Sequence, residues 1–208
     1  MYKVLQKLDE VKAMAIVRTE SFERACEIAD GLIEGGIPIM EISFTLPNAG
    51  EVISALRKKY QDRLLVGAGT VLDSETARLA ILADARFIIA PNLSVEVART
   101  CNRYRVPYMP GCTSITEAVQ GLEAGASMIK AFPISNFYGP DLINVFKTPI
   151  PYMPILASGG VQLDTISQWI SNGADCLGFG GLLTKGTSAD IAANAKLIRT
   201  KIVETLQG

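Results

Sequence analysis

The sequence predicts an α/β fold, a closed (βα)8 barrel, and three observations carry this prediction. Short β-branched runs alternate with longer amphipathic segments, and eight such units fill the 208 residues. Most of the runs are apolar nearly throughout, which is typical of parallel strands covered on both faces. Eight parallel strands that alternate with helices close into a barrel with a packed interior.

Eight runs have the length and composition of buried strands. They are AMAIVR (13–18), IMEISFT (39–45), LLVGAGTV (64–71), FIIAP (87–91), PYMPGC (107–112), MIKAFP (128–133), YMPILASGG (152–160) and CLGFGG (176–181). An open doubly wound sheet uses the same alternation, but it expects about five or six strands and a glycine-rich turn after the first. The segment IVRTESFERA contains no glycine, so we favour one closed barrel domain over residues 1–208.

The segments between the runs have helical periodicity and recognisable ends. SFERACEIADGLIEGG places apolar residues on one face and ends at Gly35 and Gly36. SVEVARTCNRY, SITEAVQGLEAG and LDTISQWISNG start at a serine or after a turn. Trp169, in the last of these, is expected to pack on the barrel, and Thr187 to open the final helix. The first residues are expected to form a short helix that caps the barrel floor.

The composition of the chain limits the partners and the cellular location that we expect. Hydrophobic residues make up 49 % and charged residues 20 % of the chain, and the net charge of −1 gives no reason to expect nucleic acid or a membrane as a partner. The N-terminus shows no secretory signal, and no apolar run approaches the roughly 18 residues of a membrane span, so a cytoplasmic location is expected. The four cysteines form no C-x-x-C pair and are expected to be buried thiols.

The absence of histidine is more informative. It excludes Ser-His-Asp chemistry, Cys-His pairs and every zinc site that needs imidazole. Acid–base chemistry in this chain must therefore use a carboxylate, lysine, tyrosine or water.

Lys130 stands out because active sites of such barrels lie at the carboxyl ends of the strands. It is the only charge in the strand MIKAFP, and alternation places it toward the barrel axis if Ile129 faces the helices. Burial lowers the pKa of a lysine and produces the neutral amine that can attack a ketone. Glu41, a lone charge in IMEISFT, is the best candidate proton carrier. The alternative is a structural ion pair between these two residues.

Paired glycines end the last two strands, where many barrels hold a phosphate through backbone N–H groups. The candidate residues are Ser158, Gly159, Gly160, Gly180 and Gly181. A pair of glycines can also be a tight turn, and only their occurrence at both strand ends favours phosphate.

Other candidate residues are less specific. Arg18 can neutralise a substrate carboxylate, or it can be a surface arginine on a loop. Thr70 can offer a hydroxyl or amide to the same carboxylate, or it can cap the next helix. Phe132 is expected to shape the pocket wall.

The segments EGGIPIMEISFTLPNA, LVGAGTV, PYMPGCTSITE and IKAFP, with the late SGG, resemble the KHG/KDPG aldolases from about residue 10 to about residue 200. The resemblance implies a (βα)8, or TIM, barrel, a common homotrimeric state, and a class I lyase that needs no cofactor and no metal. Its reaction is the reversible cleavage of 2-keto-3-deoxy-6-phosphogluconate to pyruvate and glyceraldehyde 3-phosphate, a step of the Entner-Doudoroff route in carbohydrate metabolism. Cleavage of 4-hydroxy-2-oxoglutarate or of the galactonate isomer is an alternative.

The family's motifs assign roles to particular residues. The resemblance implies that Lys130 forms the Schiff base, that Glu41 moves protons, and that the G-A-G-T segment ending at Thr70 holds pyruvate. It also implies that Pro91 lines the site and that Gly159 and Gly160 bind phosphate.

Three positions depart from the family pattern. Some members carry an arginine for the carboxylate soon after the glutamate, where this chain has Phe44 and Thr45, and we hypothesise that Arg18 replaces it. Gly181 stands where many members have serine, and Ser158 where threonine is common. Two other functions remain open on the residues alone: a phosphate-binding barrel isomerase or epimerase, and a ligand sensor without catalysis.

Overall fold

The computed structural model describes residues 1–19 and 21–208. Its strands form one parallel sheet in the order β5-β4-β3-β2-β1-β9-β8-β7-β6. The two ends of this order, β5 (Tyr108–Met109) and β6 (Gly111–Cys112), are separated in the chain by Pro110 alone. They are two pieces of one barrel strand, so the sheet is closed into a barrel. The predicted (βα)8 barrel is therefore confirmed.

Each strand lies inside a predicted run. The other strands are β1 (Ala13–Val17), β2 (Ile39–Ser43), β3 (Leu65–Gly69), β4 (Ile88–Ile89), β7 (Ile129–Ala131), β8 (Ile155–Ser158) and β9 (Cys176–Phe179). The fifth run was predicted as continuous, but it is interrupted at Pro110, which has no N–H for the ladder. The Pro110 carbonyl still accepts a hydrogen bond from the Lys130 amide at 2.8 Å, which links this strand to β7.

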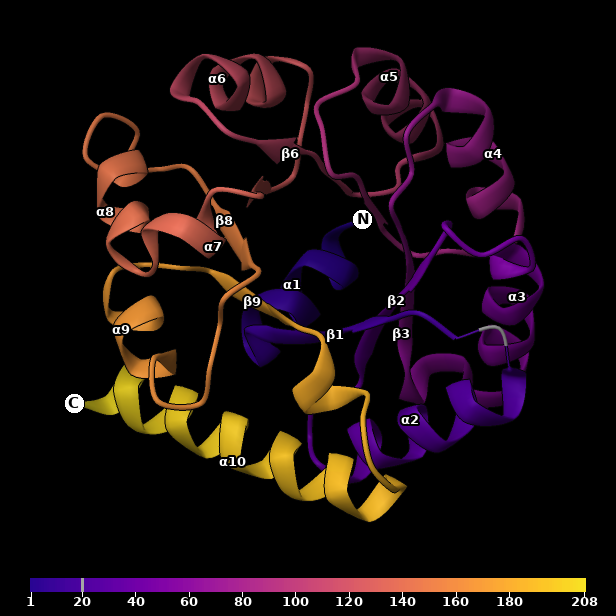
Figure 1. The fold of residues 1–208 in the computed structure, drawn as a ribbon. Helices are drawn as coiled ribbons and strands as arrows, with labels where there is room; N and C mark the ends of the chain where they lie inside the picture. Colours follow the sequence, from indigo (N-terminus) through magenta and orange to yellow (C-terminus); the bar gives the residue numbers. More distant parts are fainter. Residues whose placement is uncertain (20) are drawn as a thin grey trace.

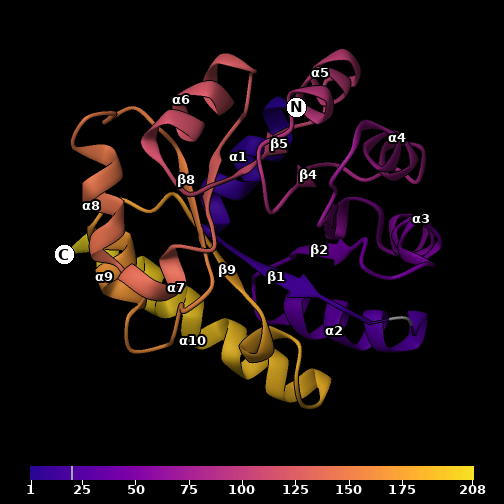
Figure 2. The same ribbon diagram turned by 45° about the horizontal axis from the view of Figure 1, so that its top comes forward.

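The helices surround the strands on the outside, as the view down the barrel shows (Figure 1). They are α2 (Phe22–Glu34), α3 (Ala49–Tyr60), α4 (Ser74–Leu82), α5 (Val95–Tyr104), α6 (Ile115–Glu123), α7 (Ser135–Tyr138), α8 (Asp141–Lys147), α9 (Ile166–Ser171) and α10 (Ser188–Gln207). Two short 3₁₀ helices, η1 (Gln61–Arg63) and η2 (Gly181–Leu183), complete the elements. The turned view of Figure 2 shows helices flanking the strands on both sides.

Several helices begin at the polar residues that the sequence predicts at their amino ends. The side chains of Ser21, Ser94 and Ser114 each accept a backbone N–H at the start of α2, α5 and α6. Thr187 caps α10 in the same way. The helices α7 and α8 were not predicted, and α9 is shorter than its pattern indicated. None of the helices in the described residues is long and apolar enough to cross a membrane.

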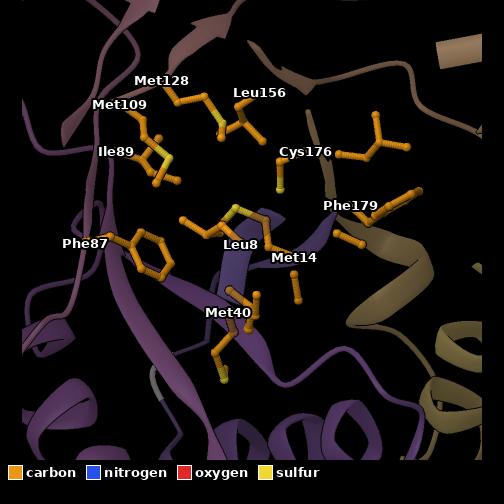
Figure 3. Packing of buried hydrophobic residues seen from close by; sticks show 14 of the residues in the cluster. Leu8, Met14, Met40, Phe87, Ile89, Met109, Met128, Leu156, Cys176 and Phe179 are labelled. Carbon is orange, nitrogen blue, oxygen red and sulfur yellow. The ribbon is translucent and has the colours of Figure 1, made fainter. Parts of the chain in front are cut away.

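The helix α1 (Tyr2–Val11) closes the floor of the barrel. It ends directly before β1 begins, so it lies at the amino ends of the strands, and it buries Val4, Leu8 and Val11. Figure 1 shows α1 inside the ring of outer helices. Figure 3 shows Leu8 of α1 within the same cluster of buried side chains as Met14 of β1. The predicted capping helix is therefore present, and it leaves only the carboxyl ends of the strands open.

Candidate active site

Lys130 and Glu41 both point into the barrel interior from different sides. Lys130 lies in β7 and is 8 % exposed, while Glu41 lies in β2 and is 2 % exposed. The two side chains line one interior pocket, whose other walls are mostly apolar. These walls are Met14, Ile16, Ile89, Leu156, Ser158 and Gly178. Alternation along the strands predicted this inward direction for Lys130.

Burial acts on the pKa of both groups. It raises the pKa of the Glu41 carboxyl above its ordinary value of 4.5, against the opposing effect of the Lys130 and Arg18 charges. It lowers the pKa of the Lys130 ammonium below 10.5; the Glu41 carboxylate opposes this effect, and the Arg18 charge adds to it. Both groups are therefore shifted toward their neutral forms by the same apolar surroundings.

The two groups do not form a closed ion pair. Among the ion pairs within residues 1–19 and 21–208, none joins Glu41 to Lys130. The buried Glu41 Oε2 has no hydrogen-bond partner. The Lys130 Nζ lies 4.6 Å from the centre of the Phe132 ring. The alternative of a structural ion pair is therefore wrong in its direct form, and the Glu41 Oε2 atom is left without a protein partner.

Gly69, at the end of β3, makes room for the Glu41 carboxylate. A Cβ atom on Gly69 would lie 2.5 Å from the Glu41 Cδ and 2.7 Å from each carboxylate oxygen. These are distances that real Cβ atoms do not show, so residue 69 must be glycine if the carboxylate is to keep this position. This packing role of the G-A-G-T segment was not predicted from the sequence.

Thr70 follows Gly69 with a φ of 58°, a left-handed conformation that is uncommon for a β-branched residue. Its hydroxyl accepts a hydrogen bond from Ser43 Oγ at 3.1 Å, and Ser43 Oγ also lies 3.0 Å from the Thr45 hydroxyl. The alternative that Thr70 caps the next helix is wrong, because Asp73 accepts the Thr76 N–H at 2.6 Å and caps α4.

A cleft of about 390 Å³ opens beside the interior pocket. The two share Ile16, Ser158 and Gly178, so the cleft adjoins the interior pocket that Lys130 and Glu41 line. The predicted residues that line the cleft are Arg18, Phe132, Ser158, Gly159, Gly160, Gly180 and Gly181. Seven of the strand-end residues selected from the sequence therefore line one cavity.

The turn after β8 requires its glycines. Gly159 and Gly160 have φ values of 92° and 75°, which side-chain-bearing residues rarely adopt. The Asn136 side chain packs against them: its Oδ1 would lie 3.2 Å from a Cβ on Gly160. Ser135, also in α7, donates a hydrogen bond to the Ser158 carbonyl. Neither Ser135 nor Asn136 was predicted, since nothing in ISNFYG marks these residues in the sequence.

Pro91 and Thr70 are not among the residues that line this cleft. The Pro91 carbonyl oxygen would lie 2.1 Å from a Cβ on Gly111, so the two backbones are in close contact. Gly111 in turn pairs with Lys130 across β6 and β7. Pro91 thus neighbours the strand that adjoins Lys130, while its predicted contact with a ligand stays a prediction.

The cysteines offer no competing nucleophile. All four are unpaired and buried. Burial raises the pKa of the Cys101 and Cys112 thiols to about 12, so both are protonated at neutral pH. The arrangement as a whole can add an amine to a carbonyl group, move protons through a buried carboxyl, and hold an anion on backbone N–H groups.

The opposite pKa shifts of the two buried groups predict opposite pH dependences of stability. A raised pKa means that the Glu41 contribution to stability is present below pH 4.5 and is lost as the pH rises through the folded-state pKa. A lowered pKa means that the Lys130 contribution is present above pH 10.5 and is lost as the pH falls through the folded-state pKa. Glu41→Gln should therefore gain stability over the parent protein as the pH rises from 4.5, and Lys130→Met as it falls from 10.5. Urea unfolding across pH tests both, and parallel curves for the two variants would contradict the shifts.

Comparison with known proteins agrees with this geometry. The model of the family described as "KDPG and KHG aldolase" matches residues 4–197. The chain is 33 % identical over 172 residues to the 2-dehydro-3-deoxy-phosphogluconate aldolase of Treponema pallidum, covering 83 % of this chain and 81 % of the relative. It is 32 % identical over 205 residues to the 2-dehydro-3-deoxy-6-phosphogalactonate aldolase of Escherichia coli, covering 95 % and 100 %.

Solved structures give the same result. A 4-hydroxy-2-oxoglutarate aldolase/2-deydro-3-deoxyphosphogluconate aldolase from TTHB1 superposes with a TM-score of 0.88 at 28 % identity, over 96 % of this chain and 98 % of that one. A native KDPGal structure also superposes with a TM-score of 0.88, at 32 % identity over 94 % and 96 %. The family model spans most of the chain, and the chain belongs to the KDPG and KHG aldolase family.

Proposed function

We propose that this protein is a class I aldolase that reversibly cleaves 2-keto-3-deoxy-6-phosphogluconate to pyruvate and glyceraldehyde 3-phosphate through a Schiff base on Lys130. One observation carries the proposal: a buried lysine with a lowered pKa shares an apolar pocket with a buried carboxyl that has no ion-pair contact to it. A lysine in this state supplies a neutral amine, and the carboxyl supplies and takes up protons.

In the proposed cleavage, the neutral amine of Lys130 adds to the keto carbon, and loss of water leaves an iminium ion. The bond between C3 and C4 then breaks, and its electron pair is delocalised onto the iminium nitrogen as an enamine. The C4 hydroxyl loses its proton to Glu41 and becomes the aldehyde. A proton returns to C3, and water hydrolyses the new iminium to release pyruvate and restore the amine.

The two charged ends of the substrate have matching groups around the cleft. Arg18 lines the cleft and is close enough to Lys130 and Glu41 to affect the pKa of both. We assign it to the substrate carboxylate, with Thr70 as a second donor. At the other end, the left-handed turn at Gly159 and Gly160 exposes backbone without side chains, which suits an approaching phosphate. Gly180 and Gly181 line the same cleft and are assigned to the phosphate as well.

A second candidate substrate is 2-keto-3-deoxy-6-phosphogalactonate. The relative in Escherichia coli that bears this name is matched over its entire length, whereas the gluconate-named relative in Treponema pallidum is matched over 81 % of its length. The two substrates differ in the configuration of the C4 hydroxyl, which becomes the aldehyde oxygen. Discrimination therefore depends on how this hydroxyl is held beside Glu41, while the pyruvate enamine is common to both. 4-Hydroxy-2-oxoglutarate, for which one of the superposed aldolases is named, is the third keto acid to test.

The proposed reaction belongs to carbohydrate metabolism, in the Entner-Doudoroff route, and it needs no metal or organic cofactor. A cytoplasmic location fits four unpaired, buried thiols, which are typical of a reducing compartment. A homotrimer, the state common in the family, is our proposal for the assembly. Exposed apolar side chains on the outer helices, such as Leu79, Leu82 and Val145, offer surface that an assembly can bury.

Lys130→Ala should lower the rate of pyruvate release from the preferred keto acid by a factor on the order of 10³ or more, because it removes the nucleophile. Lys58→Ala, an exposed lysine on α3, is the matched control and should keep the parent rate. A coupled assay of pyruvate release with the gluconate, galactonate and oxoglutarate substrates measures both variants. Near-parent activity of Lys130→Ala on any of the three would contradict the proposed mechanism.

Gly69→Ala should lower the same rate by about 100-fold, because a Cβ at residue 69 displaces the Glu41 carboxylate from its position and small misplacements of catalytic groups are costly. The control is Gly50→Ala in α3, where a Cβ would meet only Ala83 at an ordinary 3.8 Å. This control should keep full activity and gain about 0.5–1 kcal/mol of stability, as a helical glycine replaced by alanine does. Equal activities of the two folded variants would show that the Glu41 position does not matter.

A further inference from the structure

A second concave surface lies at the opposite end of the barrel from the cleft. It has a volume of about 700 Å³ and lies between α1, the turn before β2, η1 and the start of β3. We call it the floor depression. Its lining is Lys3, Val4, Lys7, Ile33, Gly36, Pro38, Arg57, Asp62, Arg63, Leu64, Leu65 and Arg86. Because α1 precedes β1 and covers the amino ends of the strands, this surface is separated from Lys130 by the barrel interior.

Positive charge is concentrated in the floor depression. Five of its lining side chains are lysine or arginine, and Asp62 is its one carboxylate. Asp84, which lies next to it, contacts Arg57 at 2.9 Å and Arg86 at 3.2 Å. The whole chain carries a net charge of −1, so an excess of cations at one place is not a property of the surface in general. Such a local field favours anionic ligands.

Arg57 is the fixed element of this surface. Its side chain is 12 % exposed, and its Nε donates to Asp84. Its Nη1 donates to the carbonyls of Gln61 at 2.6 Å and Leu64 at 3.3 Å, and Gln61 has a φ of 49° that is rare for a residue with a side chain. Within the described residues, Nη2 makes no hydrogen bond. The guanidinium is therefore held in place with one nitrogen still available to a ligand.

Arg86 is paired with Asp84, and the three remaining cations lack carboxylate partners, although the Arg63 guanidinium lies 5.5 Å from the centre of the Tyr60 ring. Among the ion pairs of residues 1–19 and 21–208, none includes Lys3, Lys7 or Arg63. Lys3 and Lys7 are one turn apart on α1, a spacing at which two like charges repel and slightly destabilise the helix. No ion pair among the described residues neutralises either lysine, and a bound anion would reduce the repulsion between them.

The base of the floor depression is apolar, formed by Val4, Ile33, Pro38, Leu64 and Leu65. Val4 and Leu64 are buried, but Ile33, Pro38 and Leu65 are only partly so. A bare inorganic anion would leave these three side chains partly exposed, whereas an organic anion can cover them and place its charged groups on the surrounding lysines and arginines. We propose that the floor depression binds a phosphorylated small molecule that carries at least two negative charges and a planar or apolar portion, as a nucleotide does. This binding is separate from the aldol reaction, in which the floor depression takes no part.

The test uses the full chain with ATP as the probe and reads out the lysines themselves. Limited acetylation followed by peptide mass spectrometry measures the reactivity of each lysine with and without ATP. Lys3 and Lys7 should react about threefold or more slowly with ATP present, because bound phosphate covers them. Lys58 and Lys201 should be unchanged. Pyrophosphate should protect only at higher concentration than ATP, and adenosine should not protect. Equal protection of all lysines, or none, would overturn the proposal.

Variants that remove positive charge test the position of the ATP site independently of lysine acetylation. Replacing Lys3, Lys7 and Arg63 together by glutamine should weaken ATP binding about tenfold or more in calorimetry, since three unpaired cations are lost. Arg57 is left in place because it supports η1. A control with Arg99, Lys196 and Lys201 replaced by glutamine removes the same charge elsewhere and should bind ATP as the parent does. Both variants should release pyruvate at the parent rate. Equal weakening in the two variants would show non-specific attraction and would contradict a site at the floor.

Discussion

The structure depends on one constraint, which is that two ionisable side chains of opposite charge lie inside an apolar barrel without contacting each other. Burial shifts Lys130 and Glu41 toward their neutral forms, and the Coulomb attraction between them opposes the shift only in part. A direct ion pair would have fixed both charges and left neither group for a substrate. The surrounding strands instead hold the amine and the carboxyl in one pocket and apart.

Several features of the fold follow from this constraint. Gly69 has no side chain because the Glu41 carboxylate occupies that volume. The barrel stays closed beside Lys130 despite the interruption at Pro110, because the proline carbonyl accepts a hydrogen bond from the Lys130 amide although the ring has no N–H to donate. The helix α1 covers the floor, so solvent and substrate reach the pocket from the carboxyl ends of the strands. The apolar side chains beneath the pocket keep the dielectric constant low where the amine lies.

The sequence predicted most of the fold because each level of its pattern agrees with the others. Apolar runs, serine caps and glycine stops all indicated eight strand–helix units, and the lone charges in MIKAFP and IMEISFT indicated the site. The strand-end rule then selected seven residues that line one cleft. Most of what the sequence reading missed depends on contacts distant in sequence. The packing of Asn136 against Gly160 and the separation of Glu41 from Lys130 are set by how the closed barrel brings strands together, and no local pattern encodes them. The cap at Asp73 is local, since Asp73 accepts the N–H of Thr76 three residues further along the chain.

The most direct measurement of the central claim is the site and pH dependence of covalent trapping with pyruvate and borohydride, followed by peptide mass spectrometry. If burial keeps the Lys130 amine neutral, the adduct should form on Lys130 at neutral pH, about three units below the ordinary lysine pKa, while exposed lysines stay unmodified. An adduct that appears only near pH 10, or that is spread over the exposed lysines, would contradict the account.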